Sequence, residues 1–103
     1  MDRIEKLMRF LEQRPDDVFV LHALALEYVK LGDEPSARAR FDRVLAVDPG
    51  HTGTYYHLAK LLERNGEREQ ALHVCEKGME ACRRAGDEHA LRELRSVYED
   101  LVY

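Results

Sequence analysis

The stretch LHALALEYVKLGDEPSA, residues 21–37, aligns with YYHLAKLLERNGEREQA, residues 55–71, at an offset of 34 residues. Four columns of this alignment hold one residue type in both copies: Leu24 with Leu58, Ala25 with Ala59, Gly32 with Gly66, and Ala37 with Ala71. Small and apolar residues at helical spacing on both sides of a glycine are typical of two short helices that cross closely and are joined by a tight turn. The offset therefore indicates an internal repeat of one helix pair.

Turn-forming residues also recur at a regular interval. Pro15, Gly32, Pro49 and Gly66 are each 17 residues apart. Between them apolar residues follow one another every three or four positions, without the strict alternation of strands. The pattern predicts an all-α fold with helices at about 2–14, 18–31, 35–47, 52–65, 68–84 and 88–102.

The apolar positions of these helices predict the core. The expected stripes consist of Ile4, Leu7, Met8 and Leu11; Leu21, Leu24, Ala25 and Tyr28; Phe41, Val44 and Leu45; Tyr55, Leu58, Ala59 and Leu62; and Leu91, Leu94, Tyr98 and Leu101. Gly32 and Gly66 suit the left-handed conformation that ends a helix. Glu67 is a weaker N-terminal cap than Asp33, so we expect the helix that begins at residue 68 to fray more readily.

The 34-residue spacing resembles the tetratricopeptide repeat family, whose helix–turn–helix unit follows W-x2-L-G-x2-Y, then A-x3-F, then P. The first copy reads Leu21-x2-Leu24-Ala25-x2-Tyr28, then Ala37-x3-Phe41, then Pro49, and the second reads Tyr55-x2-Leu58-Ala59-x2-Leu62, then Ala71-x3-Cys75. Arg83 stands where the second proline would be, which predicts that the fifth helix continues past its usual end. The stretch GTYYHLAKLLERNG, residues 53–66, is also similar to small bacterial proteins of this family.

This resemblance implies antiparallel helix pairs stacked as a short right-handed solenoid in a single domain. We expect an N-terminal half repeat at 1–17, complete repeats at 18–51 and 52–85, and a C-terminal capping helix at 86–103. The last helix aligns with the first helices of the repeats only if two extra residues lie near RRAGDE, residues 83–88.

Composition narrows the class of protein. Of the 103 residues, 45% are hydrophobic and 35% are charged, a balance typical of a soluble globular domain. The net charge of -4 disfavours nucleic acid as a partner, because phosphate binding needs a basic excess. The first 17 residues contain no apolar core of a signal peptide, and no later stretch is long enough to cross a bilayer. We therefore expect a cytoplasmic protein that does not contact a membrane.

The chain offers no constellation for catalysis, so we expect no enzyme activity and no cofactor. No two of the five histidines are four residues apart, as a helical zinc site requires, and we expect no metal. Cys75 occupies the column of Phe41, where burial would raise the thiol pKa and make it a poor nucleophile. Cys75 and Cys82 are about 10 Å apart along one helix, too far for a disulfide, so both are expected to be buried, reduced thiols.

The remaining candidate is a binding surface, because the resemblance implies that the first helix of each pair lines a concave groove. The groove residues expected beside the core stripes are Phe19, His22, Leu26, Val29 and Lys30; Tyr56, Lys60, Glu63 and Arg64; and Arg92, Ser96 and Glu99. Tyr56 is the expected anchor, since Tyr55 fills the core position and Tyr56 must face elsewhere. Two alternatives without a binding role stay open. In the first, Phe19, Leu26 and Val29 pack against the N-terminal helix; in the second, Lys60 and Arg92 are solvated surface charges.

These features predict a non-catalytic adaptor that binds a peptide segment of another protein, with acidic residues on that segment facing the cations. The carboxylate clamp of some family members does not transfer, because His22 and Leu26 stand where its Lys and Asn would be. The alternative function is a self-assembling structural module that dimerises weakly through an end helix. The apolar residues of the first helix favour it, since they exceed what one neighbouring helix covers.

Overall fold

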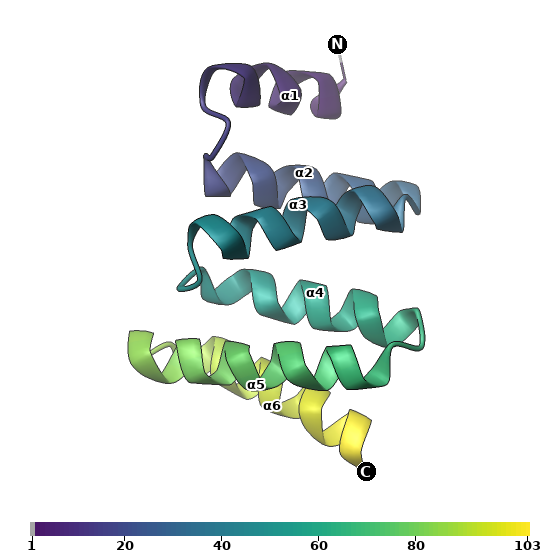
Figure 1. The fold of residues 1–103 in the computed structure, drawn as a ribbon, viewed down its shortest axis with the longest axis vertical. Helices are drawn as coiled ribbons and strands as arrows, with labels where there is room; N and C mark the ends of the chain where they lie inside the picture. The colour runs from purple at the N-terminus through teal and green to yellow at the C-terminus, as the bar shows by residue number, and fades with distance from the viewer. Residues whose placement is uncertain (1) are drawn as a thin grey trace. The chain divides into compact units, whose positions relative to one another are not determined.

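The computed structural model describes residues 2–103, and this part of the chain contains six α-helices and no strand (Figure 1). They are α1 (Arg3–Gln13), α2 (Val18–Leu31), α3 (Glu34–Val47), α4 (Thr52–Arg64), α5 (Arg68–Ala85) and α6 (Glu88–Val102). The predicted all-α class and the six predicted helices are confirmed, with each boundary within one residue. None of the described helices combines the length and the hydrophobicity that a membrane span needs.

The chain divides into two compact units, one that ends at Asp48 and one from Pro49 to Tyr103. In the first unit, α2 pairs with α3 and α1 packs against α2 (Figure 1). Its core is formed by Leu7, Leu11, Leu21, Leu24 and Val44. Ala25 and Ala37 have no exposed surface, which fits small residues that let α2 and α3 approach closely.

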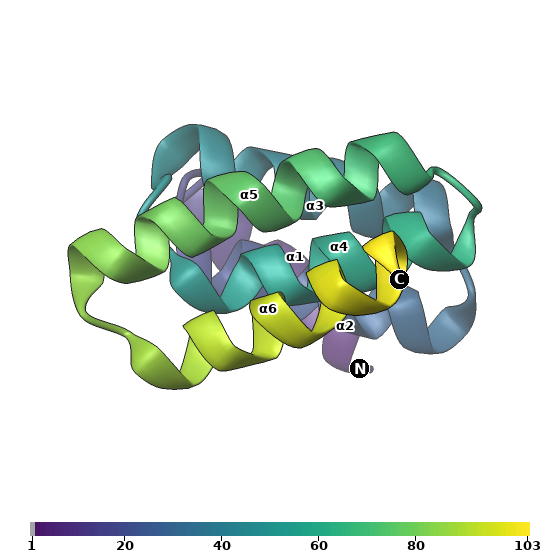
Figure 2. The same ribbon diagram turned by 90° about the horizontal axis from the view of Figure 1, so that it is seen from below.

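In the second unit, α4 pairs with α5, and α6 packs against both of them (Figure 2). Ala59, Ala71 and Cys75 are fully buried there, as their columns predict. Cys82 is also buried, and both thiols are free. The core also holds residues outside the predicted stripes, notably Leu61 and Thr54, whose hydroxyl is 2.8 Å from Nδ1 of His51.

Caps explain why the helices begin and end where they do. Gly32 and Gly66 have φ of 76° and 74°, the left-handed conformation that the sequence predicted. Asp33 accepts a hydrogen bond from the Ser36 amide, whereas Glu67 forms no such side-chain cap. Three further helices have aspartate caps that were not predicted from the sequence: Asp2, Asp17 and Asp87.

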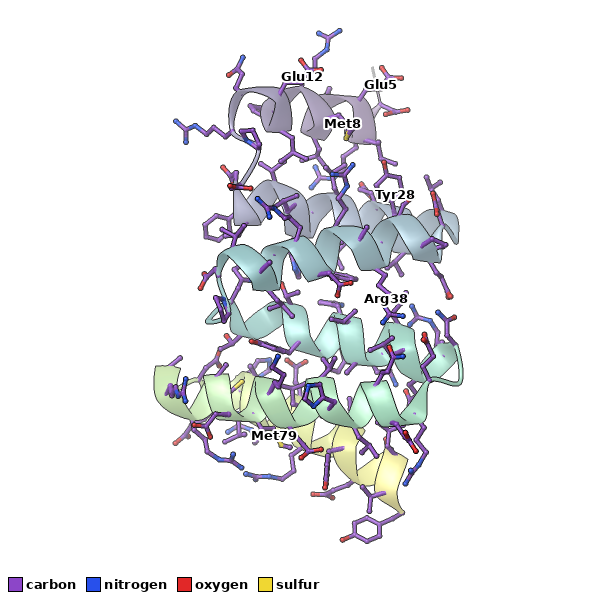
Figure 3. The ribbon with its side chains drawn as sticks, viewed as in Figure 1. Glu5, Met8, Glu12, Tyr28, Arg38 and Met79 are labelled. Atoms are coloured by element: carbon purple, nitrogen blue, oxygen red, sulfur yellow. The ribbon has the colours of Figure 1, made fainter. Side chains whose placement is uncertain are left out.

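Several residues of the predicted core stripes are not fully buried. Met8, expected in the buried stripe of α1 and labelled in Figure 3, is 38% exposed, because α2 covers the side of α1 that carries Leu7 and Leu11. On α6, Leu94 is buried as expected, but Leu91 and Tyr98 are only half-buried. Ala90 and Val97 are buried beside Leu94 instead, so this is the side of α6 that faces α4 and α5. Ile4, Tyr28, Leu45 and Leu101 are half-buried as well.

Two expectations about the C-terminal half are confirmed. Helix α5 has 18 residues against 14 for α3, as the missing proline predicted. Helix α6 begins at Glu88, 36 residues after the start of α4 at Thr52, which accounts for the two extra residues.

Candidate interaction surface

The groove residues expected on α2 lie at its N-terminal end, along its middle and in its last turns. Phe19 is 76% exposed, and His22, Leu26 and Val29 are half-buried. The imidazole of His22 lies edge-on to the ring of Phe41, with 5.8 Å between the ring centroids, so part of it belongs to the core side of the helix. Phe19 thus supplies most of the accessible aromatic surface of α2.

The cation expected at the end of α2, Lys30, is one member of an ionic cluster. Its ammonium lies 3.3 Å from Glu27, and the other carboxylate oxygen of Glu27 is 2.8 Å from Nε of Arg3 on α1. Sequence reasoning did not include Glu27 or Arg3 in the site. Their contact joins two residues that are 24 positions apart in the sequence and lie on different helices, so the spacing of residues within one helix could not indicate it.

On α4, the expected anchor Tyr56 is half-buried rather than fully exposed. Its ring lies edge-on to the imidazole of His57, with centroids 5.4 Å apart, so the neighbouring side chain covers part of it. One turn along, the Lys60 ammonium donates a hydrogen bond of 2.7 Å to Glu63. Arg64 ends the helix and is exposed.

Helix α6 packs against α4, and its carboxylates influence the charges on α4. The hydrogen bond to Glu63 raises the pKa of the Lys60 ammonium, and the carboxylate of Asp100 on α6 raises it further. Burial lowers the pKa of His57, which Glu93 on α6 partly offsets. Two acidic residues of α6 therefore belong to this surface, although the sequence analysis had assigned only Arg92, Ser96 and Glu99 to it. Those three are exposed.

The surface carried by α4 and α6 is therefore mixed in charge. The cations are Lys60, Arg64 and Arg92, and the acidic residues are Glu63, Glu93, Glu99 and Asp100. Glu93 and Asp100 could have been noticed from their seven-residue spacing, which puts them on one side of a helix. Their proximity to α4 follows only from the packing of α6.

The described part of the chain contains no group of three His, Cys, Asp or Glu side chains close enough to hold a metal ion. Burial raises the pKa of the Cys75 thiol to about 11, so almost none of it is thiolate at neutral pH. In the first unit, α2 presents aromatic and aliphatic side chains, and in the second unit α4 and α6 present an aromatic ring and paired charges.

The repeated helix pair identifies the family. The family model of the tetratricopeptide repeat matches residues 28–94, which is more than half of the chain. This chain belongs to the tetratricopeptide repeat family. A search of curated proteins finds no match.

Solved structures of other proteins resemble this one. A tetratricopeptide repeat domain protein from Salinibacter ruber, solved by NMR, is 36% identical, with a TM-score of 0.80 over 84% of this chain and 88% of its own. A protein from Bordetella parapertussis is 24% identical, with a TM-score of 0.84 over 99% and 89%. The TPR2B domain of yeast Sti1, in complex with pHsp70, is 18% identical, with a TM-score of 0.89 over 96% and 79%. The last two likenesses concern the fold alone.

Proposed function

We propose that this tetratricopeptide repeat protein is a non-catalytic adaptor that binds a peptide segment of another protein. The binding helices would be the first helices of the repeats, α2 and α4, and the C-terminal helix α6, which aligns with them. The observation that carries the proposal is the half-buried Tyr56 beside Lys60 on α4. An aromatic ring held at the surface by a neighbour loses little entropy on binding and anchors many interfaces. Two related folds, in Sti1 and in Spaghetti, are complexes with Hsp70 or Hsp90 segments, which supports peptide binding as a class.

The expected segment carries an apolar or aromatic anchor and some acidic residues. The anchor would contact Tyr56 on α4, or Phe19 and Leu26 on α2, and the acidic residues would approach Arg64 and Arg92. Because Lys60 already bonds Glu63 and lies near Asp100, its charge is partly neutralised. Apolar contact should therefore contribute more to affinity than charge does. Salt should mainly slow association, since exposed charges act over roughly 8 Å at physiological ionic strength.

The proposal is tested by affinity capture from the source cell followed by mass spectrometry. The variant Tyr56→Ala, Lys60→Glu should lose the captured partners. Because Tyr56 is half-buried and Lys60 bonds Glu63, the variant should also lose some stability, and a circular dichroism melt establishes that it is folded at the temperature of the capture. The matched control is His73→Ala, Lys77→Glu, which makes similar changes on the exposed face of α5. If both variants capture the same partners as the native protein, the α4 surface is not the binding site.

The same reasoning suggests where the protein acts. Cys75 and Cys82 are buried free thiols, which suits a reducing compartment such as the bacterial cytoplasm. We propose that location, and that the protein works without catalysis, metal or cofactor.

A second candidate function is self-association through the N-terminal helix. The observation that favours it is Phe10 on α1, which is 61% exposed. Exposed aromatic side chains on an end helix are common at sites where proteins associate. Sedimentation of the purified chain tests this candidate, since a monomer at every concentration would exclude it.

A further inference from the structure

Within the first unit, the two most exposed phenylalanines line one hollow. It has a volume of about 480 Å³ and lies where α1 ends and α2 begins, between Phe10, which is 61% exposed, and Phe19, which is 76% exposed. Leu7 and Val20 form its apolar floor, and Gln13, Arg14 and Asp17 complete the lining. Exposed aromatic surface around a hollow is a feature of docking sites.

The lining of this hollow contains one cation and one acid, Arg14 and Asp17, and cations outnumber acids once the adjoining hollow is included. The carboxylate of Asp17 already accepts hydrogen bonds from the amides of Phe19 and Val20, at 3.0 and 3.2 Å, and so caps α2. Arg14 remains as an exposed cation of the lining. Lys6 and Arg9 line a second hollow of about 270 Å³, which shares Phe10 and Gln13 with the first. A partner for this face should therefore combine large apolar side chains with acidic ones.

The last turn of α6 has this chemistry. In the second unit, the large hydrophobic side chains that are exposed are Val102, at 39%, and Tyr103, at 97%. Glu99 lies next to them on the helix and is exposed. The carbonyl of Leu101 accepts a hydrogen bond of 2.9 Å from Nε of Arg68 at the start of α5, which fixes this turn in place. The last turn of α6 is therefore an ordered element that presents both apolar side chains and the acidic Glu99.

The net charges of the two helices are also complementary. Helix α1, residues 3–13, contains three cations and two acids, a net charge of +1, whereas α6, residues 88–102, contains two cations and four acids, a net charge of -2. Opposite net charges on two surfaces steer them together. Like charges disfavour contact between two copies of the same surface. Two α1 faces would bring Lys6, Arg9 and Arg14 of both copies together.

We propose that the Phe10–Phe19 hollow of one copy binds the last turn of α6 of a second copy. The inference rests on the self-association candidate and specifies its two faces. The contact is heterologous, because a different surface is used on each copy, so a dimer keeps one unused hollow on one copy and one unused α6 turn on the other. One helix turn in one hollow buries less surface than a stable dimer interface, so the association is weak, with a dissociation constant of roughly 10 µM to 1 mM.

The contact does not simply continue the repeat by pairing α6 with α1 of the next copy. In the complete pairs, the columns that meet where the helices cross hold alanine: Ala25 and Ala59 on the first helices, Ala37 and Ala71 on the second. At the corresponding places α6 has Arg95 and α1 has Arg3. Two arginines would keep these helices apart and repel each other, which leaves the hollow beside Phe10 as the place of contact.

Sedimentation velocity of the 103-residue chain from about 10 µM to about 1 mM is the first test. We expect species larger than a dimer to form as concentration rises, since every dimer still presents one free face of each kind. Phe10→Ser should remove one face, and Val102→Ser with Tyr103→Ser should remove the other. Each variant alone should raise the apparent dissociation constant at least about tenfold. Leu31→Ser, at another exposed leucine of the first unit, is the matched control and should sediment as the native chain does.

Mixing the two variants gives the decisive measurement. Each variant keeps the face that the other lacks, so an equimolar mixture should form a one-to-one heterodimer and nothing larger. Arg14→Glu alone and Glu99→Arg alone should each weaken association. The two changes together on one chain exchange the charges and should restore it. Circular dichroism melts establish that each variant is folded.

The outcomes separate the inference from the candidate on which it rests. A native chain that stays monomeric throughout excludes both. If Phe10→Ser abolishes association while the α6 variant associates normally, self-association stands and the α6 assignment is wrong. A mixture that remains monomeric, or a Leu31→Ser variant that fails as badly as Phe10→Ser, also overturns the inference.

Discussion

Gly78 on α5 lies directly against Tyr55 on α4. A Cβ atom placed on Gly78 would be 2.6 Å from Cβ of Tyr55 and 2.7 Å from Cδ1 of Leu94 on α6. Gly78 occupies the column of Val44 in the other repeat, where Leu21 stands in place of Tyr55. The two repeats thus share the space at the helix crossing differently: a large ring faces glycine in one, and leucine faces valine in the other.

Gly78→Ala should therefore destabilise the protein. Replacing glycine by alanine inside a helix normally stabilises by about 1 kcal/mol, but overpacking a core costs about 1–3 kcal/mol. Here the methyl group meets the stiff Cβ of Tyr55 rather than a flexible side-chain end, so the overpacking cost should lie in the upper half of that range, about 2–3 kcal/mol, which leaves a net loss of roughly 1–2 kcal/mol. Urea unfolding measures it.

Gly53→Ala is the matched control, because a Cβ there has no heavy atom within 4 Å. That variant should be as stable as the native protein or slightly more stable. Equal stability of both variants would mean that α4 and α5 are not in close contact at Gly78.

The two thiols should be unreactive in the native protein. Cys75 is fully buried and its pKa is raised to about 11, and burial also raises the pKa of Cys82. At pH 8 a thiol with a pKa near 11 is thiolate in only about one molecule in a thousand. We expect an aromatic disulfide reagent to label neither residue until guanidinium unfolds the chain. The single variants Cys75→Ser and Cys82→Ser assign any native-state labelling, and rapid labelling of Cys75 would contradict its place in the core.

The fold could be predicted from the sequence because its determinants are local and repeated. The helix ends are set by Gly32 and Gly66, and the helix crossings by the repeated alanines. Each of these residues lies within one or two turns of the feature that it determines. The surface was predicted less completely, since it depends on where α6 packs. The Lys60–Asp100 and His57–Glu93 pairs join helices far apart in sequence, and the exposure of Leu91 depends on which side of α6 faces α4 and α5.

His57 should make stability depend on pH. Burial lowers its pKa below the ordinary value of 6.5. The unfolded chain therefore binds more protons than the native protein between that native pKa and about pH 7, and the free energy of unfolding should fall as pH drops through this window. His57→Gln should have a shallower dependence when unfolding is followed between about pH 5 and 7.5. A native slope in His57→Gln would show that other groups cause it.

Asp33 and Glu67 occupy the same column of the repeat but cap their helices unequally. Their backbones are nearly identical, with φ and ψ of -87° and 77° at Asp33 and of -89° and 64° at Glu67. Asp33 accepts a hydrogen bond of 3.2 Å from the Ser36 amide and one of 2.8 Å from the Ser36 hydroxyl. The side chain of Glu67 is one methylene longer and forms no cap hydrogen bond.

Glu67→Asp should therefore stabilise the protein, because the shorter carboxylate can reach the first amides of α5 from a backbone that already suits it. Caps of this kind contribute about 1 kcal/mol, so Asp33→Ala should cost about that amount and Glu67→Ala much less. Hydrogen exchange of the first amides of α5 and urea unfolding measure the local and global effects. Faster exchange or lower stability in Glu67→Asp than in the native protein would mean that Glu67 contributes through another interaction, and that the longer side chain is the better choice at this turn.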